Sequence, residues 1–186
     1  MMKVFNEPSI NEWASILARP TIDAAQLHDK VNAIIKEVVV SGDAAIKKLT
    51  LQFDGISINE FKVPVKKIAA AENLISAALK TAIQLAKVNI EIFHNSQIQK
   101  VERIETMPGV WCWRKSVGIE KVGIYIPGGS APLFSTVLML GVPAKMAGCK
   151  EIILCTPPNE QGDIHPAILY AASLVGVTAI YNVGGA

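Results

Sequence analysis

The hydrophobic pattern of the chain changes near residue 100. Before that point apolar residues recur every three or four positions, the spacing of one face of an α-helix. The last and longest of these segments contains no Gly or Pro and is rich in Ala, so we expect one continuous helix there. Residues 1–100 are therefore predicted to form a helical region, with helices over residues 10–17, 24–40 (capped by Asp23), 44–53 and 66–95.

Residues 101–186 contain short apolar runs separated by helical segments. A turn at Met107-Pro108-Gly109 precedes a run over residues 110–117 that alternates as a half-exposed strand does. The order strand, helix, strand, helix, strand, with strands apolar on both sides, is typical of a parallel sheet covered on both faces. The predicted strands are 122–126, 151–155 and 178–183, and the predicted helices are 135–147 and 165–174.

The last predicted strand leads into Asn182-Val183-Gly184-Gly185-Ala186. A strand that ends at two glycines in a parallel sheet normally feeds a further helix, and without it one face of that strand lacks cover. We therefore expect the chain to be a piece of a longer protein. The alternative is a native C-terminus that leaves an edge strand.

Composition excludes several classes of protein. Hydrophobic residues make up 51% and charged residues 18% of the chain, which favours a folded core over disorder. The net charge of +2 is spread along the chain with no dense Lys/Arg face, so a nucleic-acid partner is not expected. No segment reaches the ~18 apolar residues of a membrane span, and the N-terminus lacks the apolar core of a signal peptide.

The three cysteines, Cys112, Cys149 and Cys155, are odd in number and lack metal-binding spacing. This pattern is typical of reduced, buried cysteines in a cytosolic protein. A nucleophilic cysteine is the alternative, and Cys155, at the end of an apolar run, is its best candidate.

Residues 121–147, KVGIYIPGGSAPLFSTVLMLGVPAKMA, carry the clearest functional signal. An apolar strand enters a Pro-Gly-Gly turn and then a helix, which is where α/β proteins usually bind a ligand. The turn lacks the Gly-Lys-Ser/Thr ending of a P-loop, and its glycines do not give G-x-G-x-x-G. The acidic residue expected at the end of the second strand is also missing, since Thr156-Pro157-Pro158 stands there.

Two residues near this turn have both a structural and a functional interpretation. Tyr125 fills core with its ring, or it contacts a ligand from the end of its strand. Ser135 is expected as the N-cap of the following helix, with a ligand contact as the alternative. The histidines lie on separate segments without a second ligand nearby, so no metal site is predicted from this chain alone: His28, His94 and His165.

The stretch KVGIYIPGGSAPLFSTVLMLGVPAKMAGCKEIILCTPP resembles histidinol dehydrogenase. The similarity continues through the helix that follows to the ending YNVGGA, and upstream to IFHNSQ and more loosely to NEWASILARP. It covers essentially this whole chain but only the N-terminal part of the family's length. The resemblance implies a cytoplasmic, NAD-dependent, zinc-requiring homodimer with Rossmann-like domains, so the fold expected here is an incomplete Rossmann-like parallel sheet over residues 101–186.

The resemblance also implies roles for particular residues. Such enzymes oxidise L-histidinol to L-histidine in two hydride transfers through an enzyme-held aldehyde. The family's NAD-contacting tyrosine falls on Tyr125. The residues Pro127, Gly128 and Gly129 would line the same cofactor pocket. Ser135 matches a serine near the substrate.

The family's zinc ligands, its Glu-His proton-transfer pair and a further NAD-contacting Gln and Asn lie downstream of the region resembled. This chain alone is therefore expected to be inactive, with no catalytic and no metal-binding residue of its own. Two other hypotheses are a non-catalytic nucleotide-binding or assembly module that uses the same loop, and a different dehydrogenase with an unrelated substrate.

Overall fold

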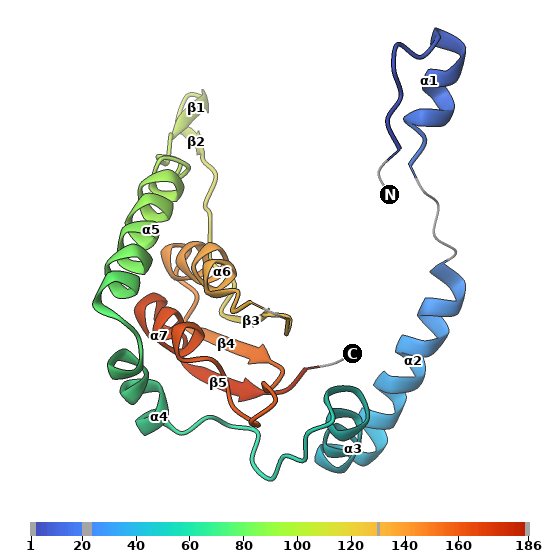
Figure 1. The fold of residues 1–186 in the computed structure, drawn as a ribbon. Coiled ribbons are helices and arrows are strands. Elements are labelled where there is room, and N and C mark those ends of the chain that lie inside the picture. The colour runs from blue at the N-terminus through green and yellow to red at the C-terminus, as the bar shows by residue number, and fades with distance from the viewer. Residues whose placement is uncertain (1–2, 20–23, 130, 185–186) are drawn as a thin grey trace.

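A three-stranded parallel sheet lies at the centre of the molecule (Figure 1). The structure is a computed structural model that describes residues 3–19, 24–129 and 131–184. The strands are β3 (Lys121–Tyr125), β4 (Glu151–Thr156) and β5 (Ala179–Asn182), in the order β3-β4-β5. Helix α6 (Phe134–Met146) connects the first two strands and α7 (Pro166–Val175) the last two. The predicted order of strands and helices is therefore confirmed.

Only one face of this sheet is covered by described residues. In register across the strands, Ile124, Leu154 and Ile180 are at most 8% exposed and belong to the core that α6 and α7 complete. Their neighbours on the opposite face, Tyr125 and Tyr181, are exposed or half-buried. The prediction of cover on both faces is thus wrong for the described residues. Strands added in one direction through right-handed crossovers place both connecting helices on the same side.

A second helical layer packs on α6 and α7. It consists of α4 (Val65–Ala70), the 3₁₀-helix η1 (Ala71–Leu74) and α5 (Ala77–Asn95). Its fully buried residues Ala71 and Ile83 share one hydrophobic core with Leu138 of α6. A single core therefore joins residues from both sides of position 100.

The continuous helix expected over residues 66–95 is wrong. Ile75 is extended (φ −121°, ψ 151°), and Ser76 begins a new helix by accepting a hydrogen bond at Oγ from the N–H of Leu79 (3.2 Å). A serine N-cap satisfies one of the free N–H groups at a helix start, so a break costs less here than at an alanine. The break lets η1 and α5 take different directions across α7 and α6.

The outer edge of β5 is paired by the connection that precedes α4. The N–H of Val63 donates to the carbonyl of Ile180 (2.9 Å), and the N–H of Asn182 donates to the carbonyl of Phe61 (2.7 Å). This bridge runs antiparallel, with Lys62 opposite Tyr181. It carries the chain from α3 past the end of β5 before the second helical layer begins.

The remaining elements are not part of the sheet or of the two helical layers on it. Helix α1 (Ile10–Ile16) starts at a capping box of Ser9 and Glu12, and α2 (Ala24–Ser41) packs on α3 (Asp43–Asp54). In Figure 1, α1 and α2 extend from the rest of the molecule. The hairpin of β1 (Ile104–Met107) and β2 (Val110–Cys112) is exposed throughout, and β2 is shorter than the strand expected over 110–117. The expected cap Asp23 and the terminal Gly185-Ala186 lie outside the described residues.

None of the helices that the structure describes has the length and apolar character needed to cross a membrane.

Candidate functional site

An open cleft of about 790 Å³ lies at the carboxyl ends of β3 and β4. Its volume is within the roughly 300–1,000 Å³ of ligand pockets, and this end of a parallel sheet is where α/β proteins bind ligands. The Pro-Gly-Gly turn forms one wall, the loop after β4 another, and the end of α3 approaches from outside the sheet. The residues that line the cleft are Asp54, Ile56, Tyr125, Pro127, Gly128, Gly129, Pro157, Pro158, Asn159, Glu160, Gln161 and His165.

Two of the glycines around the cleft are packed closely against a neighbouring residue, whereas a third has open space beside it. A Cβ at Gly128 would lie 2.8 Å from Cγ of Pro157, and a Cβ at Gly184 would lie 2.3 Å from Cβ of Pro157. Pro157 is therefore held between the ends of β3 and β5, and both glycines are needed for that packing. A Cβ at Gly129 would meet nothing within 4 Å. Gly129 is thus the position where the backbone stays open to the cleft.

Helix α6 begins beside this turn without a side-chain cap. Its N-cap is Leu133, whose side chain makes no capping hydrogen bond, and the N–H of Thr136 bonds the Leu133 carbonyl. The expectation that Ser135 is the N-cap is wrong, because Ser135 is the second residue of the helix and is exposed. A helix start of this kind presents backbone N–H groups and the positive end of the helix dipole to an acceptor.

Tyr125 ends β3 at the mouth of the cleft, and its side chain is 46% exposed. It pairs in register with Cys155, which in turn pairs with Tyr181, so the three form a row across the ends of the strands. Burial raises the pKa of the Cys155 thiol. A raised thiol pKa lowers the thiolate fraction at neutral pH, so the nucleophilic alternative for Cys155 is disfavoured.

Asp54 is one of the cleft residues that the sequence did not indicate. It is the last residue of α3, before Gly55 in the left-handed conformation (φ 71°), and by sequence it is a helix terminator. Its Oδ2 atom is buried and accepts no hydrogen bond from the described residues. Desolvation raises the pKa of this carboxyl. No local pattern indicates that α3 delivers this carboxyl to the end of β3.

The three histidines are not brought together. His165 caps α7, since its Nδ1 accepts from the N–H of Ala167 (3.1 Å), which leaves the proton of the neutral ring on Nε2. His28 and His94 lie on α2 and α5. Among residues 3–19, 24–129 and 131–184, no three His, Cys, Asp or Glu side chains are grouped so that they could hold a metal ion.

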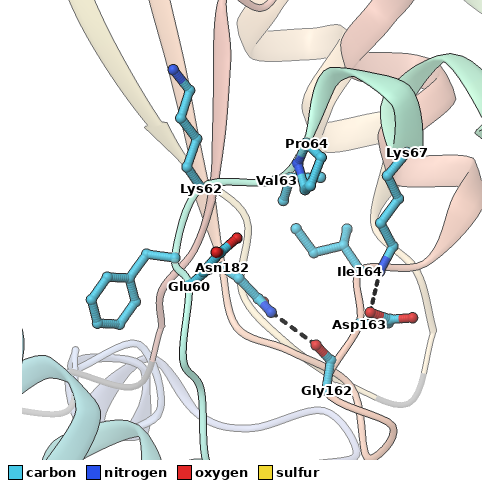
Figure 2. Close-up of a pocket in the computed structure, with 10 residues that line it drawn as sticks. Glu60, Lys62, Val63, Pro64, Lys67, Gly162, Asp163, Ile164 and Asn182 are labelled. Carbon is cyan, nitrogen blue, oxygen red and sulfur yellow. Dashed lines mark hydrogen bonds and ion pairs between the residues drawn. The ribbon is translucent and has the colours of Figure 1, made fainter.

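A smaller cavity of about 110 Å³ lies at the end of β5, and Figure 2 shows its lining. Asn182 is 8% exposed and donates from Nδ2 to the carbonyl of Gly162 (3.0 Å), while Lys67 forms an ion pair with Asp163. These contacts fasten the loop after β4 to β5 and to α4. They position one wall of the larger cleft.

Comparisons with known proteins all point to one family. The family model described as histidinol dehydrogenase matches residues 17–186. A histidinol dehydrogenase of Bacteroides thetaiotaomicron is 55% identical over 185 residues, which are 100% of this chain and 43% of that protein. One from Xylella fastidiosa is 47% identical over 184 residues, with 98% and 42% covered.

The crystal structure of histidinol dehydrogenase from Elizabethkingia anophelis superposes with a TM-score of 0.89 at 49% identity. That match covers 96% of this chain and 41% of the other. The chain thus spans less than half the length of the relatives it matches.

Proposed function

The chain belongs to the histidinol dehydrogenase family, and from this membership we propose that it is part of an enzyme that oxidises L-histidinol to L-histidine with NAD. The alcohol loses a hydride and a proton to give the aldehyde. The hydrated aldehyde loses a second hydride and two protons to give the carboxylate. Each hydride would go to an NAD bound at that step, and water would supply the second carboxylate oxygen.

The observation that carries the proposal is the convergence of the four expected cofactor residues on one cleft. Tyr125, Pro127, Gly128 and Gly129 all line the cleft at the end of β3. The space beside Gly129 and the uncapped start of α6 fit a cofactor that carries a pyrophosphate. NAD, when bound, supplies the hydride acceptor, and these residues bind and orient it.

Each of these residues has a distinct proposed part. The ring of Tyr125 packs against the cofactor, and Gly129 lets the backbone approach it. The role of Gly128 is to keep the turn packed on Pro157. Ser135 is proposed to lie near the substrate, on the exposed first turn of α6.

We propose that zinc and the acid–base residues are contributed by the part of the parent protein that this chain does not span. Oxidation of an alcohol needs a base for the hydroxyl proton, and a zinc ion can hold the substrate oxygen and favour its deprotonation. The parent is proposed to be a cytoplasmic homodimer, with no nucleic-acid or membrane partner. We propose that the chain divides near residue 100 into a helical region and a partial Rossmann-like α/β domain, which share one hydrophobic core.

The test is histidinol-dependent NADH formation by the full-length parent protein and by the 186-residue chain. We expect turnover by the parent and none above blank by the chain alone. Tyr125→Ala in the parent is expected to raise the NAD Kd about 2- to 10-fold, the scale of 0.5–1.5 kcal/mol for an aromatic packing contact.

Tyr181→Ala is the matched control, because Tyr181 lies in the same row but is not among the residues that line this cleft. NAD binding without histidinol oxidation by the parent would favour the non-catalytic module. An NAD Kd unchanged by Tyr125→Ala would remove the assignment of that residue.

A further inference from the structure

The end of β4 has no acidic side chain where dinucleotide-binding folds commonly place one. In such folds a carboxylate at the end of the second strand binds the ribose hydroxyls of the adenosine. Here the residues are Thr156, which is 2% exposed, then Pro157 and Pro158. Pro157 is held between Gly128 and Gly184, so the ends of all three strands are packed together at this point. A carboxylate cannot come from β4 itself.

Asp54 brings a carboxylate to the same cleft from a different element. It lies about 100 residues before the end of β4 in sequence, yet it lines the cleft together with Pro157 and Pro158. Its Oδ2 atom is buried without a hydrogen-bond donor among the described residues. Oδ2 is closed to solvent, so a hydroxyl of a ligand in the cleft has to reach the carboxylate through its other oxygen, Oδ1. A carboxylate with an unpaired oxygen is costly to bury, and a hydrogen bond from the ligand offsets part of that cost.

The position of Asp54 does not benefit the fold. A negative charge on the last residue of a helix opposes the helix dipole. Desolvation raises the pKa of this carboxyl, which means that the fold disfavours its charged form. Residues that break local rules without stabilising the fold are expected at functional sites.

The charges along the cleft restrict what the carboxylate can bind. Glu160 is a second acidic residue of the lining, and among the described residues that line the cleft there is no Lys or Arg. A 2′-phosphate on the ribose would meet like charge and no cation, whereas a ribose diol offers two hydroxyl donors. The lining thus favours the unphosphorylated cofactor.

We propose that Asp54 binds the adenosine ribose hydroxyls of NAD, in place of an acidic residue at the end of β4, and that it excludes NADP. This inference rests on the proposed function for the identity of the cofactor. Asp54 would thus determine the cofactor specificity of the cleft, although it belongs to the helical region and not to the parallel sheet.

The experiment measures Kd values of the full-length parent protein for NAD, for NAD lacking the adenosine 2′-hydroxyl, and for NADP by calorimetry. We expect wild type to bind both other compounds at least about 10-fold more weakly than NAD, because a hydrogen bond to a charged group contributes a factor of roughly 10 to 100. Asp54→Asn should weaken NAD by a similar factor and largely abolish the preference for NAD over its 2′-deoxy form.

Glu160→Gln is the matched control, since Glu160 is an exposed carboxylate of the same cleft and its change should leave that preference intact. Equal preference of wild type for NAD and its 2′-deoxy form overturns the inference even if Asp54→Asn does not fold. An unchanged preference in a folded Asp54→Asn protein overturns it as well. NAD binding with the expected preference but without histidinol oxidation contradicts only the proposed function, whereas no NAD binding by wild type contradicts both.

Discussion

The α/β body of this molecule buries its large apolar side chains, whereas the N-terminal arm exposes most of those that the structure describes. In the body, formed by β3–β5 with α6 and α7, Leu138, Leu154 and Val175 are completely buried. In the arm, formed by α1 and α2, the large apolar side chains that the structure describes are mostly exposed, among them Ile10, Trp13, Leu27, Ile35 and Val39. Both regions have the apolar spacing of helices or strands. Spacing therefore specifies the element but not the surface that will cover it.

The surface area of the whole chain reflects this difference. Its accessible surface is 13,687 Å² for a mass of 20.0 kDa. A compact monomer of that mass exposes about 8,700 Å². The excess is consistent with an arm and an open sheet face that are built to be covered by further protein. Three comparisons between well-packed and exposed positions test this difference.

The largest expected effect is on the free energy of unfolding when one buried and one exposed helical leucine are each replaced by alanine. Leu138 on α6 is fully buried, whereas Leu27 on α2 is 57% exposed. In the 186-residue chain, Leu138→Ala should lower the free energy of unfolding by about 2–5 kcal/mol, because a cavity is left in the core. Leu27→Ala should change it by no more than about 0.5 kcal/mol. Urea denaturation followed by circular dichroism measures both.

The same pair in the full-length parent sharpens the comparison. If the arm is covered there, Leu27→Ala becomes costly while Leu138→Ala keeps its effect. Similar losses for the two changes in the isolated chain would show that the arm already packs on something in solution.

A smaller effect is expected where α6 and α7 approach most closely. A Cβ at Gly141 would lie 2.4 Å from Cγ2 of Val175. Gly141→Ala should cost about 1–3 kcal/mol through overpacking, reduced by the roughly 1 kcal/mol that Ala gains over Gly in a helix. Gly123→Ala is the control, since a Cβ at Gly123 meets nothing within 4 Å. Adding Val175→Ala to Gly141→Ala should relieve the clash, and a double variant that shows no relief would contradict close packing here.

The body was predictable from sequence because its elements are separated by turn residues and its strands are continuously apolar. The helix over 66–95 was not, because Leu74 and Ile75 before Ser76 and the alanines after it preserve the helical spacing through the break. That break is set by the N-cap at Ser76 and by packing of η1 on α7, and packing is not visible in a periodic pattern. The uncovered face of the sheet was missed for a related reason, since half-buried Ile153 and Cys155 are as apolar as the buried residues beside them.

The candidate site was predictable only where it is local. Tyr125, Pro127, Gly128 and Gly129 are adjacent in sequence, so their meeting at one cleft follows from the turn that they form. Asp54 belongs to a different helix and reaches the cleft only through the tertiary fold. Ser135 was placed at the helix start because serine is a preferred N-cap, yet the N-cap is two residues earlier, at Leu133.

The smallest expected effect leaves the fold unchanged and compares two cysteines. Cys155 lies within the sheet with a pKa raised by burial, whereas Cys112 lies on the exposed hairpin. The thiolate is the reactive form, and each unit by which a thiol pKa rises lowers the thiolate fraction about tenfold at neutral pH. Iodoacetamide at pH 7 should therefore label Cys112 well before Cys155, as followed by peptide mass spectrometry. Labelling of Cys155 should rise with pH while the far-ultraviolet circular dichroism stays constant. Equal labelling rates of the two cysteines at pH 7 in folded protein would mean that the reagent reaches Cys155 freely from the open face of the sheet. The α/β body would then protect only the residues on the covered face of its sheet.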